Sequence, residues 1–287
     1  MVKICDILNE GIEILSDKCE NVRFEAELLL AACLKKDRIY IAVHKNDSVE
    51  KDIYTSFISQ CKRRADGEPS AYITGSKEFM GLEFCVNPSV LIPRPETELI
   101  VEHIISRYQD RPVSIIDICT GSGAIACSLA YYLPRAKITA TDISSEALNT
   151  ARINAEKLGV SDRVSFTLHD ALGNFEFGKS FDLAVSNPPY IRSDVIETLE
   201  TNVKNYEPHI ALDGGNDGLI FYRNIVDNIE SLIISGGELV FEIGCDQGED
   251  LRKIMSSKFK DIQITKDYAG LDRLASGILK QTLQPLC

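Results

Sequence analysis

Apolar residues recur at helical spacing through the first part of the chain. Residues three or four apart share one face of a helix. Three such stripes precede residue 68, formed by Ile4, Ile7, Leu8, Ile12 and Leu15, by Leu28, Leu29, Ala32 and Cys33, and by Ile53, Phe57, Ile58 and Cys61. Because elements this short cannot stand alone, we expect them to pack together as a small N-terminal helical bundle domain over residues 1–72.

The pattern changes between Glu78 and Val86, where apolar and polar residues nearly alternate. Alternation on both sides of the central Met80-Gly81 pair is typical of a β-hairpin. We expect this β-hairpin to serve as a linker over residues 73–92. The second domain then spans residues 93–287.

Beyond the hairpin, short apolar runs alternate with helical stretches. Continuous apolar runs predict buried parallel strands, and the stretches between them predict helices on both faces of one sheet. The predicted strands are Val113–Cys119, Lys137–Thr141, Arg163–Leu168, Phe181–Ser186, Glu238–Ile243, Asp261–Tyr268 and Leu274–Lys280, and the predicted helices include Leu99–Tyr108, Ala124–Leu133, Glu146–Leu158 and Gly218–Ile234. The expected fold class is therefore α/β, with a doubly wound, seven-stranded, mostly parallel sheet.

The composition is that of an ordinary folded protein, with 44% hydrophobic and 26% charged residues among 287. The amphipathic N-terminus does not read as a signal peptide, and no apolar stretch approaches the length of a membrane span. We expect a cytoplasmic protein without a membrane partner. Nine cysteines without a C-x-x-C pair, and only four histidines, predict reduced thiols and no metal site.

The charge is acidic, and its distribution bears on the choice of partner. The net charge is −12. Residues 1–70 contain 11 Lys and Arg and 13 Asp and Glu, a net charge of −2. Residues 71–287 contain the other 20 Lys and Arg and 30 Asp and Glu, a net charge of −10. Proteins that bind a nucleic acid duplex usually present a basic face to its phosphates. Only the short cluster Lys62-Arg63-Arg64 is basic, so we expect no direct nucleic acid partner.

A glycine-rich turn joins the first predicted strand of the sheet to a helix of small residues. We call residues 119–123 the glycine turn and assign cofactor contacts to all of them: Cys119, Thr120, Gly121, Ser122 and Gly123. The two glycines allow a ligand to approach the backbone closely. Gly121–Ala126 also fits G-x-G-x-x-A, so this turn alone does not separate NAD from S-adenosylmethionine.

Two acids follow the next two predicted strands. Asp142 lies about 20 residues beyond the first glycine, where a carboxylate accepts hydrogen bonds from ribose hydroxyls. Both candidate cofactors contain that sugar. Asp170, with Ala171 beside it, is placed where an acid meets the amino group of an adenine. We therefore predict cofactor contacts at Asp142, Asp170 and Ala171.

The segment Asn187-Pro188-Pro189-Tyr190, which we call the Asn-Pro-Pro-Tyr turn, follows the fourth predicted strand. Its two prolines remove two N–H donors, so that carbonyl oxygens and one side-chain amide remain. Such a surface of acceptors suits an NH2 group. The turn also lies at the switch point of the sheet, where ligands bind in open α/β folds. We predict that these four residues are catalytic, that the reaction takes place on a planar nitrogen, and that Asn187 also contacts the cofactor.

Together these motifs resemble class I S-adenosylmethionine-dependent methyltransferases that methylate amino groups. Pro93–Glu98, Tyr206-Glu207-Pro208 and Ala211–Leu219 narrow the resemblance to the HemK/PrmC family of protein-(glutamine-N5) methyltransferases. The resemblance implies S-adenosylmethionine as cofactor and, as protein substrate, the glutamine of the Gly-Gly-Gln motif in class-1 peptide chain release factors. It also implies that Tyr190 packs on the flat substrate amide. We expect the enzyme to be a monomer.

The chain departs from the family pattern at two positions. The usual first glycine of the cofactor loop is Cys119 here, and the position after Asp170, often aromatic, is Ala171. Cysteine suits its position if the backbone angles there are ordinary, since we expect only Gly121 and Gly123 to need the freedom of glycine.

Three other functions share parts of this pattern. An adenine-N6 methyltransferase acting on DNA or RNA would use the same acceptor surface, although the acidic charge argues against it. An NAD-dependent oxidoreductase would share the glycine turn and Asp142, but its chemistry would not require the Asn-Pro-Pro-Tyr turn. A non-catalytic peptide-binding module would not require the glycine turn, because it binds no cofactor.

Overall fold

The computed structural model describes residues 2–109, 111–178 and 180–281. They form two compact units. One unit holds the residues up to Ser76 together with Glu200–Tyr206, and the other holds Lys77–Leu199 and the residues from Glu207 onward. The segment Glu200–Tyr206 thus belongs to the first unit, although it lies in the range that the sequence assigned to the second domain. None of the helices in the described residues is long and apolar enough to cross a membrane.

The first unit is helical, as expected. Its elements are α1 Ile4–Leu15, α2 Val22–Leu34, α3 Arg38–Val43, α4 Lys51–Ala65, α5 Ser70–Thr74 and α9 Thr201–Tyr206, with a two-residue strand pair of β1 Val2–Lys3 and β2 Ser48–Val49. Apolar side chains of α1, α2 and α4 meet in one core around the fully buried Phe57. In α2 these are Ala26, Leu29, Leu30 and Ala31, whereas Leu28 and Ala32 of the predicted stripe lie outside the core. Gly11 of α1 lies against the ring of Phe57, and a larger residue there would displace it.

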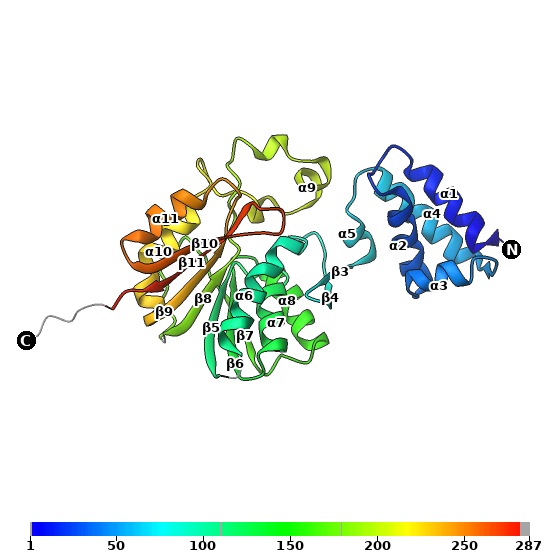
Figure 1. Ribbon diagram of the computed structural model, residues 1–287. Coiled ribbons are helices and arrows are strands. Elements are labelled where there is room, and N and C mark those ends of the chain that lie inside the picture. The colour runs from blue at the N-terminus through cyan, green and yellow to red at the C-terminus, as the bar shows by residue number, and fades with distance from the viewer. Residues whose placement is uncertain (1, 110, 179, 282–287) are drawn as a thin grey trace, which may run out of the picture. The chain divides into compact units, whose positions relative to one another are not determined.

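The second unit is built on a seven-stranded sheet, which confirms the predicted fold class (Figure 1). Its strands are β5 Val113–Ile118, β6 Ala136–Asp142, β7 Val164–Leu168, β8 Phe181–Ser186, β9 Ile233–Glu242, β10 Phe259–Lys266 and β11 Asp272–Leu279. Their order across the sheet is β10-β11-β9-β8-β5-β6-β7. The pairs among β5 to β9 are parallel, and β11 is antiparallel to both of its neighbours.

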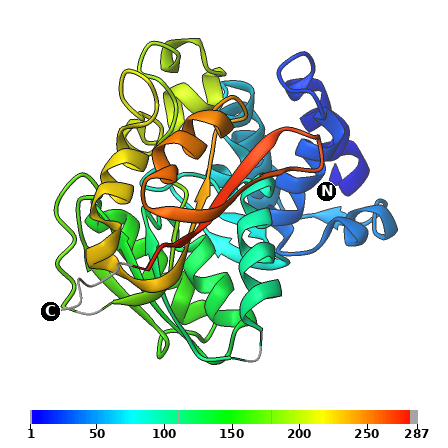
Figure 2. The same ribbon diagram turned by 60° about the vertical axis from the view of Figure 1, so that its left-hand side comes forward.

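Helices cover both faces of this sheet and bury two separate cores. α6 Glu98–Tyr108, α7 Ala124–Tyr132 and α8 Ser145–Lys157 lie on one face, and α10 Ile220–Leu232 and α11 Gly248–Ser256 lie on the other (Figures 1 and 2). Successive side chains of a strand point to opposite faces. Ile115 accordingly enters the first core, whereas Ile116 and Ile118 enter the second.

The predicted hairpin is formed by β3 Ser76–Phe79 and β4 Leu82–Cys85. Some bounds differ from the sequence prediction: β10 begins and ends two residues earlier, β11 begins two residues earlier, and α10 is shorter by two residues at each end. β9 begins at Ile233 rather than at Glu238, because Phe181 pairs with Ile233 across a shift of register in front of Leu183. Helix α11 was not predicted; it has only nine residues, and its buried side chains are confined to one face.

The direction of the strands decides where a ligand can bind. Parallel strands bring their carboxyl ends to the same edge of a sheet, and loops leave that edge toward opposite faces at the switch point. Here β5 lies between β6 and β8, at the point where the order reverses. The glycine turn follows β5, Asp142 is the last residue of β6 and the Asn-Pro-Pro-Tyr turn follows β8, so all three meet at one edge.

Candidate active site

A cavity of about 270 Å³ opens at the carboxyl ends of these strands. The predicted residues in its wall are Cys119, Thr120, Gly121, Ser122, Asp142, Asp170, Ala171, Asn187 and Pro189. Gly123, Pro188 and Tyr190 are not among the described residues of the wall. The structure thus brings the glycine turn, both acids and part of the Asn-Pro-Pro-Tyr turn into one site. The described residues contain no group of three or more His, Cys, Asp and Glu arranged to hold a metal ion.

The glycine turn has left-handed backbone angles at three positions. The φ angles are 63° at Cys119, 55° at Gly121 and 78° at Gly123. The condition that Cys119 has ordinary backbone angles is therefore not met, and the expectation that only Gly121 and Gly123 adopt angles that favour glycine is wrong. An L-residue in this region costs roughly 1–2 kcal/mol through contact of its Cβ with the backbone. Burial also raises the pKa of the Cys119 thiol, so this side chain remains a neutral group.

The two glycines of the turn serve different purposes. A Cβ at Gly123 would lie 3.0 Å from Cβ of Ala151 in α8 and 3.2 Å from Sγ of Cys127 in α7, so this glycine lets the two helices pack closely. A Cβ at Gly121 would meet nothing within 4 Å. Gly121 therefore leaves its backbone open toward the cavity, where a ligand can approach it.

Two carboxylates, of which Asp117 is buried and Asp142 partly exposed, hold the glycine turn from two sides. The Thr120 hydroxyl donates to Oδ2 of the fully buried Asp117 (2.6 Å), and the Gly121 N–H donates to Oδ2 of Asp142 (2.8 Å). The Ser144 N–H donates to the other oxygen of Asp142 (2.9 Å). Desolvation raises the pKa of Asp117 to about 7 and also raises the pKa of Asp142. Because each carboxylate oxygen has two lone pairs, Asp142 can still accept hydrogen bonds from a ligand.

Apolar side chains beside the two acids provide surface that the motifs did not identify. Ile143 and Leu172 line the cavity and remain 48% and 40% exposed. Asp170 is exposed, and its Oδ1 accepts the Leu172 N–H (2.8 Å). The available signal was that Ile143 follows Asp142 directly and that Leu172 lies two residues after Asp170. Together they form an apolar slot with an acceptor at its rim.

Asn187 faces a residue from the Pro93–Glu98 segment. Its Nδ2 lies 3.4 Å from Oγ1 of Thr97, which is only 4% exposed and also lines the cavity. Thr97 ends a short 3-10 helix, Pro95–Thr97, that leads into α6. The amide nitrogen is thereby engaged, and the Oδ1 acceptor of Asn187 is left for a ligand.

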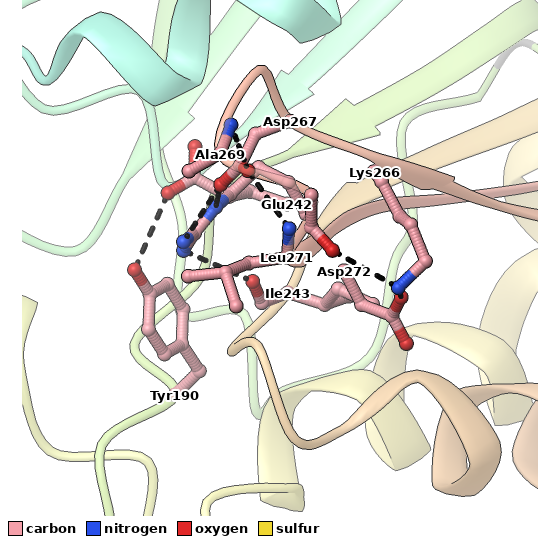
Figure 3. A network of polar contacts seen from close by, with 10 residues as sticks. Tyr190, Glu242, Ile243, Lys266, Asp267, Ala269, Leu271 and Asp272 are labelled. Carbon is pink, nitrogen blue, oxygen red and sulfur yellow. Dashed lines mark hydrogen bonds and ion pairs between the residues drawn. The ribbon is translucent and has the colours of Figure 1, made fainter.

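Tyr190 has a different environment from the one expected. Its ring packs against the core under α10 and α11, and its hydroxyl donates to Oε1 of Glu242 at the end of β9 (3.3 Å; Figure 3). Burial raises the pKa of Glu242 to about 7, against the charge of Arg273, which lowers it. The other oxygen of this carboxylate, Oε2, is buried and has no hydrogen-bond partner among the described residues. Packing of Tyr190 on a substrate amide stays a prediction.

The residues after the Asn-Pro-Pro-Tyr turn are held by the loop 211–219. The Ile191 N–H donates to the Leu212 carbonyl (3.0 Å), and the Gly214 N–H donates to the Ile191 carbonyl (2.8 Å). Nε2 of the buried Gln247 donates to the carbonyl oxygens of Tyr190 (3.1 Å) and Gly218 (3.2 Å). The loop 211–219 and Gln247, which we together call the brace, therefore fix the position of Tyr190 and Ile191.

An ion pair joins two segments that border the cavity. Nη2 of Arg94 donates to Oε1 of Glu207 (2.5 Å), and the Ile92 N–H donates to Oε2 of the same carboxylate (3.2 Å). The Glu207 side chain is 1% exposed, whereas Arg94 keeps 34% of its side chain exposed and lines the cavity. The pair fixes the Pro93–Glu98 segment beside Asn187.

This strand order, with a glycine turn after β5 and an acid after β6, defines the class I methyltransferase fold. A solved methyltransferase from Pyrococcus furiosus shares the fold, with a TM-score of 0.51 and 18% identity, over 72% of this chain and 92% of that chain.

Comparison of sequences gives the family. The model of the PrmC N-terminal domain matches residues 6–75, and that of the methyltransferase small domain matches residues 95–205. Release factor glutamine methyltransferases of Clostridium acetobutylicum and Staphylococcus aureus are each 38% identical over 96% of this chain and 99% of theirs. The relative from Moorella thermoacetica is 42% identical over 88% of this chain and 90% of its own. The chain belongs to the release factor glutamine methyltransferase family, as its motifs indicated.

The strain at Cys119 can be measured with two substitutions. We expect Cys119→Gly to be more stable than Cys119→Ala by about 1 kcal/mol, because the two differ by a Cβ that is unfavourable at positive φ. The same pair at Cys127, inside α7, should give the opposite order, since alanine favours a helix over glycine by about 1 kcal/mol. Urea denaturation measures both differences. Equal or reversed stability at Cys119 would contradict the left-handed geometry.

Because Gly218 belongs to the brace, we expect the Gly218→Ala substitution to lower the stability of the protein. A Cβ at this position would collide with the Tyr190 carbonyl oxygen and lie 2.9 Å from Nε2 of Gln247, at a φ of 72°. We expect a loss of roughly 2–4 kcal/mol in the free energy of unfolding, the sum of backbone strain and overpacking. Gly236→Ala is the control, because its φ is 81° but its Cβ would meet nothing within 4 Å. Equal losses in urea denaturation would show that contact with Tyr190 is unimportant.

Proposed function

We propose that this protein transfers a methyl group from S-adenosylmethionine to the side-chain amide nitrogen of the glutamine in the Gly-Gly-Gln motif of class-1 peptide chain release factors. The relatives from Clostridium acetobutylicum and Moorella thermoacetica are named for this activity. The observation that carries the proposal is the engaged Nδ2 of Asn187, which leaves an oxygen acceptor in the wall of the same cavity as Gly121 and Asp142.

The residues around the cavity fit S-adenosylmethionine. Asp142 has lone pairs for ribose hydroxyls, and Gly121 has an open backbone at the same place. Ile143 and Leu172 offer apolar surface for an adenine ring, with Asp170 as acceptor for its amino group. When bound, the cofactor supplies an electrophilic methyl group. Residue 171 is alanine and offers no aromatic ring to stack on adenine. Dispersion contacts with Ile143 and Leu172 therefore provide the affinity for the adenine ring.

Asn187 and the turn that contains it orient the nucleophile. Oδ1 of Asn187 and the carbonyl oxygen of Pro188 accept the two hydrogens of the glutamine NH2 group, so that the nitrogen lone pair points toward the methyl group. These acceptors also stabilise the positive charge that develops on nitrogen. Amide nitrogen is scarcely basic, and its proton becomes acidic only as the new N–C bond forms. A strong general base is therefore unnecessary, and water can take the proton.

The remaining expectations concern the partner and the location. The first unit is proposed to bind the release factor, and the enzyme to act as a monomer in the cytoplasm. Methylation of adenine N6 in DNA or RNA is the competing reaction, since an exocyclic amine suits the same acceptors. The net charge of −12 opposes a phosphate backbone and favours a protein substrate.

Mass spectrometry of a release factor after reaction tests the proposed activity. We expect a gain of one methyl group on the glutamine of Gly-Gly-Gln, and no product from an adenine-containing oligonucleotide under the same conditions. Asn187→Ala should lower kcat by at least 100-fold, in the range of an oxyanion-hole deletion, with cofactor binding still measurable. Asn149→Ala, at an exposed position of α8, is the control. Methylation of the oligonucleotide alone, or an unchanged kcat for Asn187→Ala, would refute the proposal.

Thermal unfolding identifies the cofactor. S-adenosylhomocysteine at about 100 times its Kd should raise the Tm by roughly 3–6 °C, since binding to the native state adds about 2.7 kcal/mol. NAD at the same concentration should leave the Tm unchanged. Asp142→Ala should reduce the shift, because it removes the acceptor for ribose. A shift with NAD alone would favour the oxidoreductase.

A further inference from the structure

The wall of the cavity pairs two acids with a single basic residue. Asp142 ends β6 and Asp170 follows β7, whereas Arg94 is the one lysine or arginine among the described residues of the wall. S-adenosylmethionine ends in a methionine tail that carries a carboxylate and an ammonium group. Removing a carboxylate from water into a cavity that already holds two acids is unfavourable unless a cation lies beside it. Arg94 is the side chain that can meet this need.

The order of the strands indicates where the tail of a bound cofactor would lie. We expect adenine beside Asp170, after β7, and ribose beside Asp142, at the end of β6. The tail leaves the ribose ring on the side opposite the adenine, so it extends from β6 toward β5 and β8. Asn187 follows β8. The carboxylate is therefore expected at the end of the cavity where Asn187 is found.

Arg94 lies at this same end. The Thr97 N–H donates to the Arg94 carbonyl oxygen (3.1 Å), and Oγ1 of Thr97 lies 3.4 Å from Nδ2 of Asn187. One short 3-10 turn, Pro95–Thr97, thus connects Arg94 with the residue that contacts Asn187. Arg94, Thr97 and Asn187 all line the cavity. The cation and the expected carboxylate consequently share one region of the site.

The guanidinium of Arg94 is oriented from behind and keeps donors for a ligand. Its Nη2 donates to Oε1 of Glu207 (2.5 Å), and the other oxygen of Glu207 accepts the Ile92 N–H (3.2 Å). The Glu207 side chain is buried, whereas a third of the Arg94 side chain is exposed. A guanidinium has five N–H groups, and Glu207 is its one acceptor among the described residues. A planar fork held in this way suits a carboxylate, which it can bind through two parallel hydrogen bonds.

Glu207 also makes a basic residue compatible with a positively charged cofactor. The sulfonium of S-adenosylmethionine is a cation, and an unpaired arginine in the same cavity would repel it. The Glu207 carboxylate offsets the charge of Arg94. The pair therefore directs N–H donors at the tail without adding a net positive charge to the site.

We propose that Arg94 binds the carboxylate of the methionine tail, and that Glu207 is the positioning residue that orients its guanidinium. This assignment rests on S-adenosylmethionine as the cofactor of the proposed function. It makes Arg94 a determinant of specificity, because a thioether of adenosine that lacks the carboxylate loses this contact. The motifs of the sequence assigned no role to Arg94.

Two ligands that differ only in the carboxylate test the assignment. They are S-adenosylhomocysteine and its decarboxylated analogue, which keeps the adenosine, the sulfur and the amino group. Calorimetry on the full-length protein gives the Kd of each. For the wild type we expect the analogue to bind roughly 10-fold to 100-fold more weakly, the value of charge-assisted hydrogen bonds. In Arg94→Met the two Kd values should differ by less than about threefold, because neither ligand finds the guanidinium.

A second substitution keeps the ion pair in place. Arg94→Lys retains a cation beside Glu207 but loses the planar fork. We expect it to reduce the wild-type ratio of the two Kd values by roughly threefold or more, since an ammonium group does not bind a carboxylate in the bidentate manner. An unchanged ratio in this variant would contradict the proposal even if Arg94→Met did not fold.

Arg107→Met is the matched control for the loss of an ion pair. Arg107 of α6 also pairs with a buried glutamate, because its Nε lies 3.0 Å from Oε2 of Glu238. It lies outside the wall of this cavity. The variant should therefore keep the wild-type ratio of the two Kd values.

The outcomes separate this proposal from the proposed function. If Arg94→Met weakens both ligands by the same factor, the wild-type ratio persists, Arg94 is merely structural and the proposal is overturned. Unchanged Kd values with a raised KM for the release factor would overturn it as well, because Arg94 would then bind the protein substrate. If the wild type does not bind S-adenosylhomocysteine, the proposed cofactor is wrong. If the wild type binds both ligands equally well, only the role of Arg94 is wrong.

Discussion

The geometry of the Asn-Pro-Pro-Tyr turn must be imposed from outside, because two prolines leave it without the backbone N–H groups that usually fix a turn. The brace supplies this constraint: Gln247 donates to the Tyr190 carbonyl, and the loop 211–219 pairs with Ile191. Gly218 packs directly on the Tyr190 carbonyl. Gln247 is buried and directly precedes α11, which begins at Gly248, so the packing of this helix on the sheet also positions the side chain that holds the turn.

The cofactor side of the cavity is held by two carboxyl groups. Asp117 and Asp142 organise the glycine turn through the Thr120 hydroxyl and the Gly121 N–H. Neither carboxylate has a cation as partner in these contacts, so desolvation raises the pKa of both. The left-handed Cys119 adds backbone strain at the same place. Such strain persists where the surrounding structure determines the conformation, as it does between β5 and α7.

Periodicity predicted most of the fold because the strands of a parallel sheet are buried on both faces and appear as continuous apolar runs. β8 has the predicted bounds, Phe181–Ser186, and the ends of β5, β6 and β7 differ by one residue. Periodicity missed the start of β9, where Ile234 to Gly236 are exposed beside a shift of register. It also missed α11, where only Leu251, Ile254 and Met255 of the nine residues are apolar.

The amino-acid sequence by itself determined the sheet, the glycine turn, the acids at strand ends, the acceptors of the Asn-Pro-Pro-Tyr turn and the family, because these are carried by neighbouring residues or by regular spacing. Tertiary structure alone decided the φ of Cys119, the apolar slot of Ile143 and Leu172, and the contacts of Asn187 with Thr97 and of Tyr190 with Glu242. Asn187 and Thr97 are 90 residues apart. Hydrogen bonds and backbone strain depend on the positions of atoms in space, and only the folded chain brings such residues together.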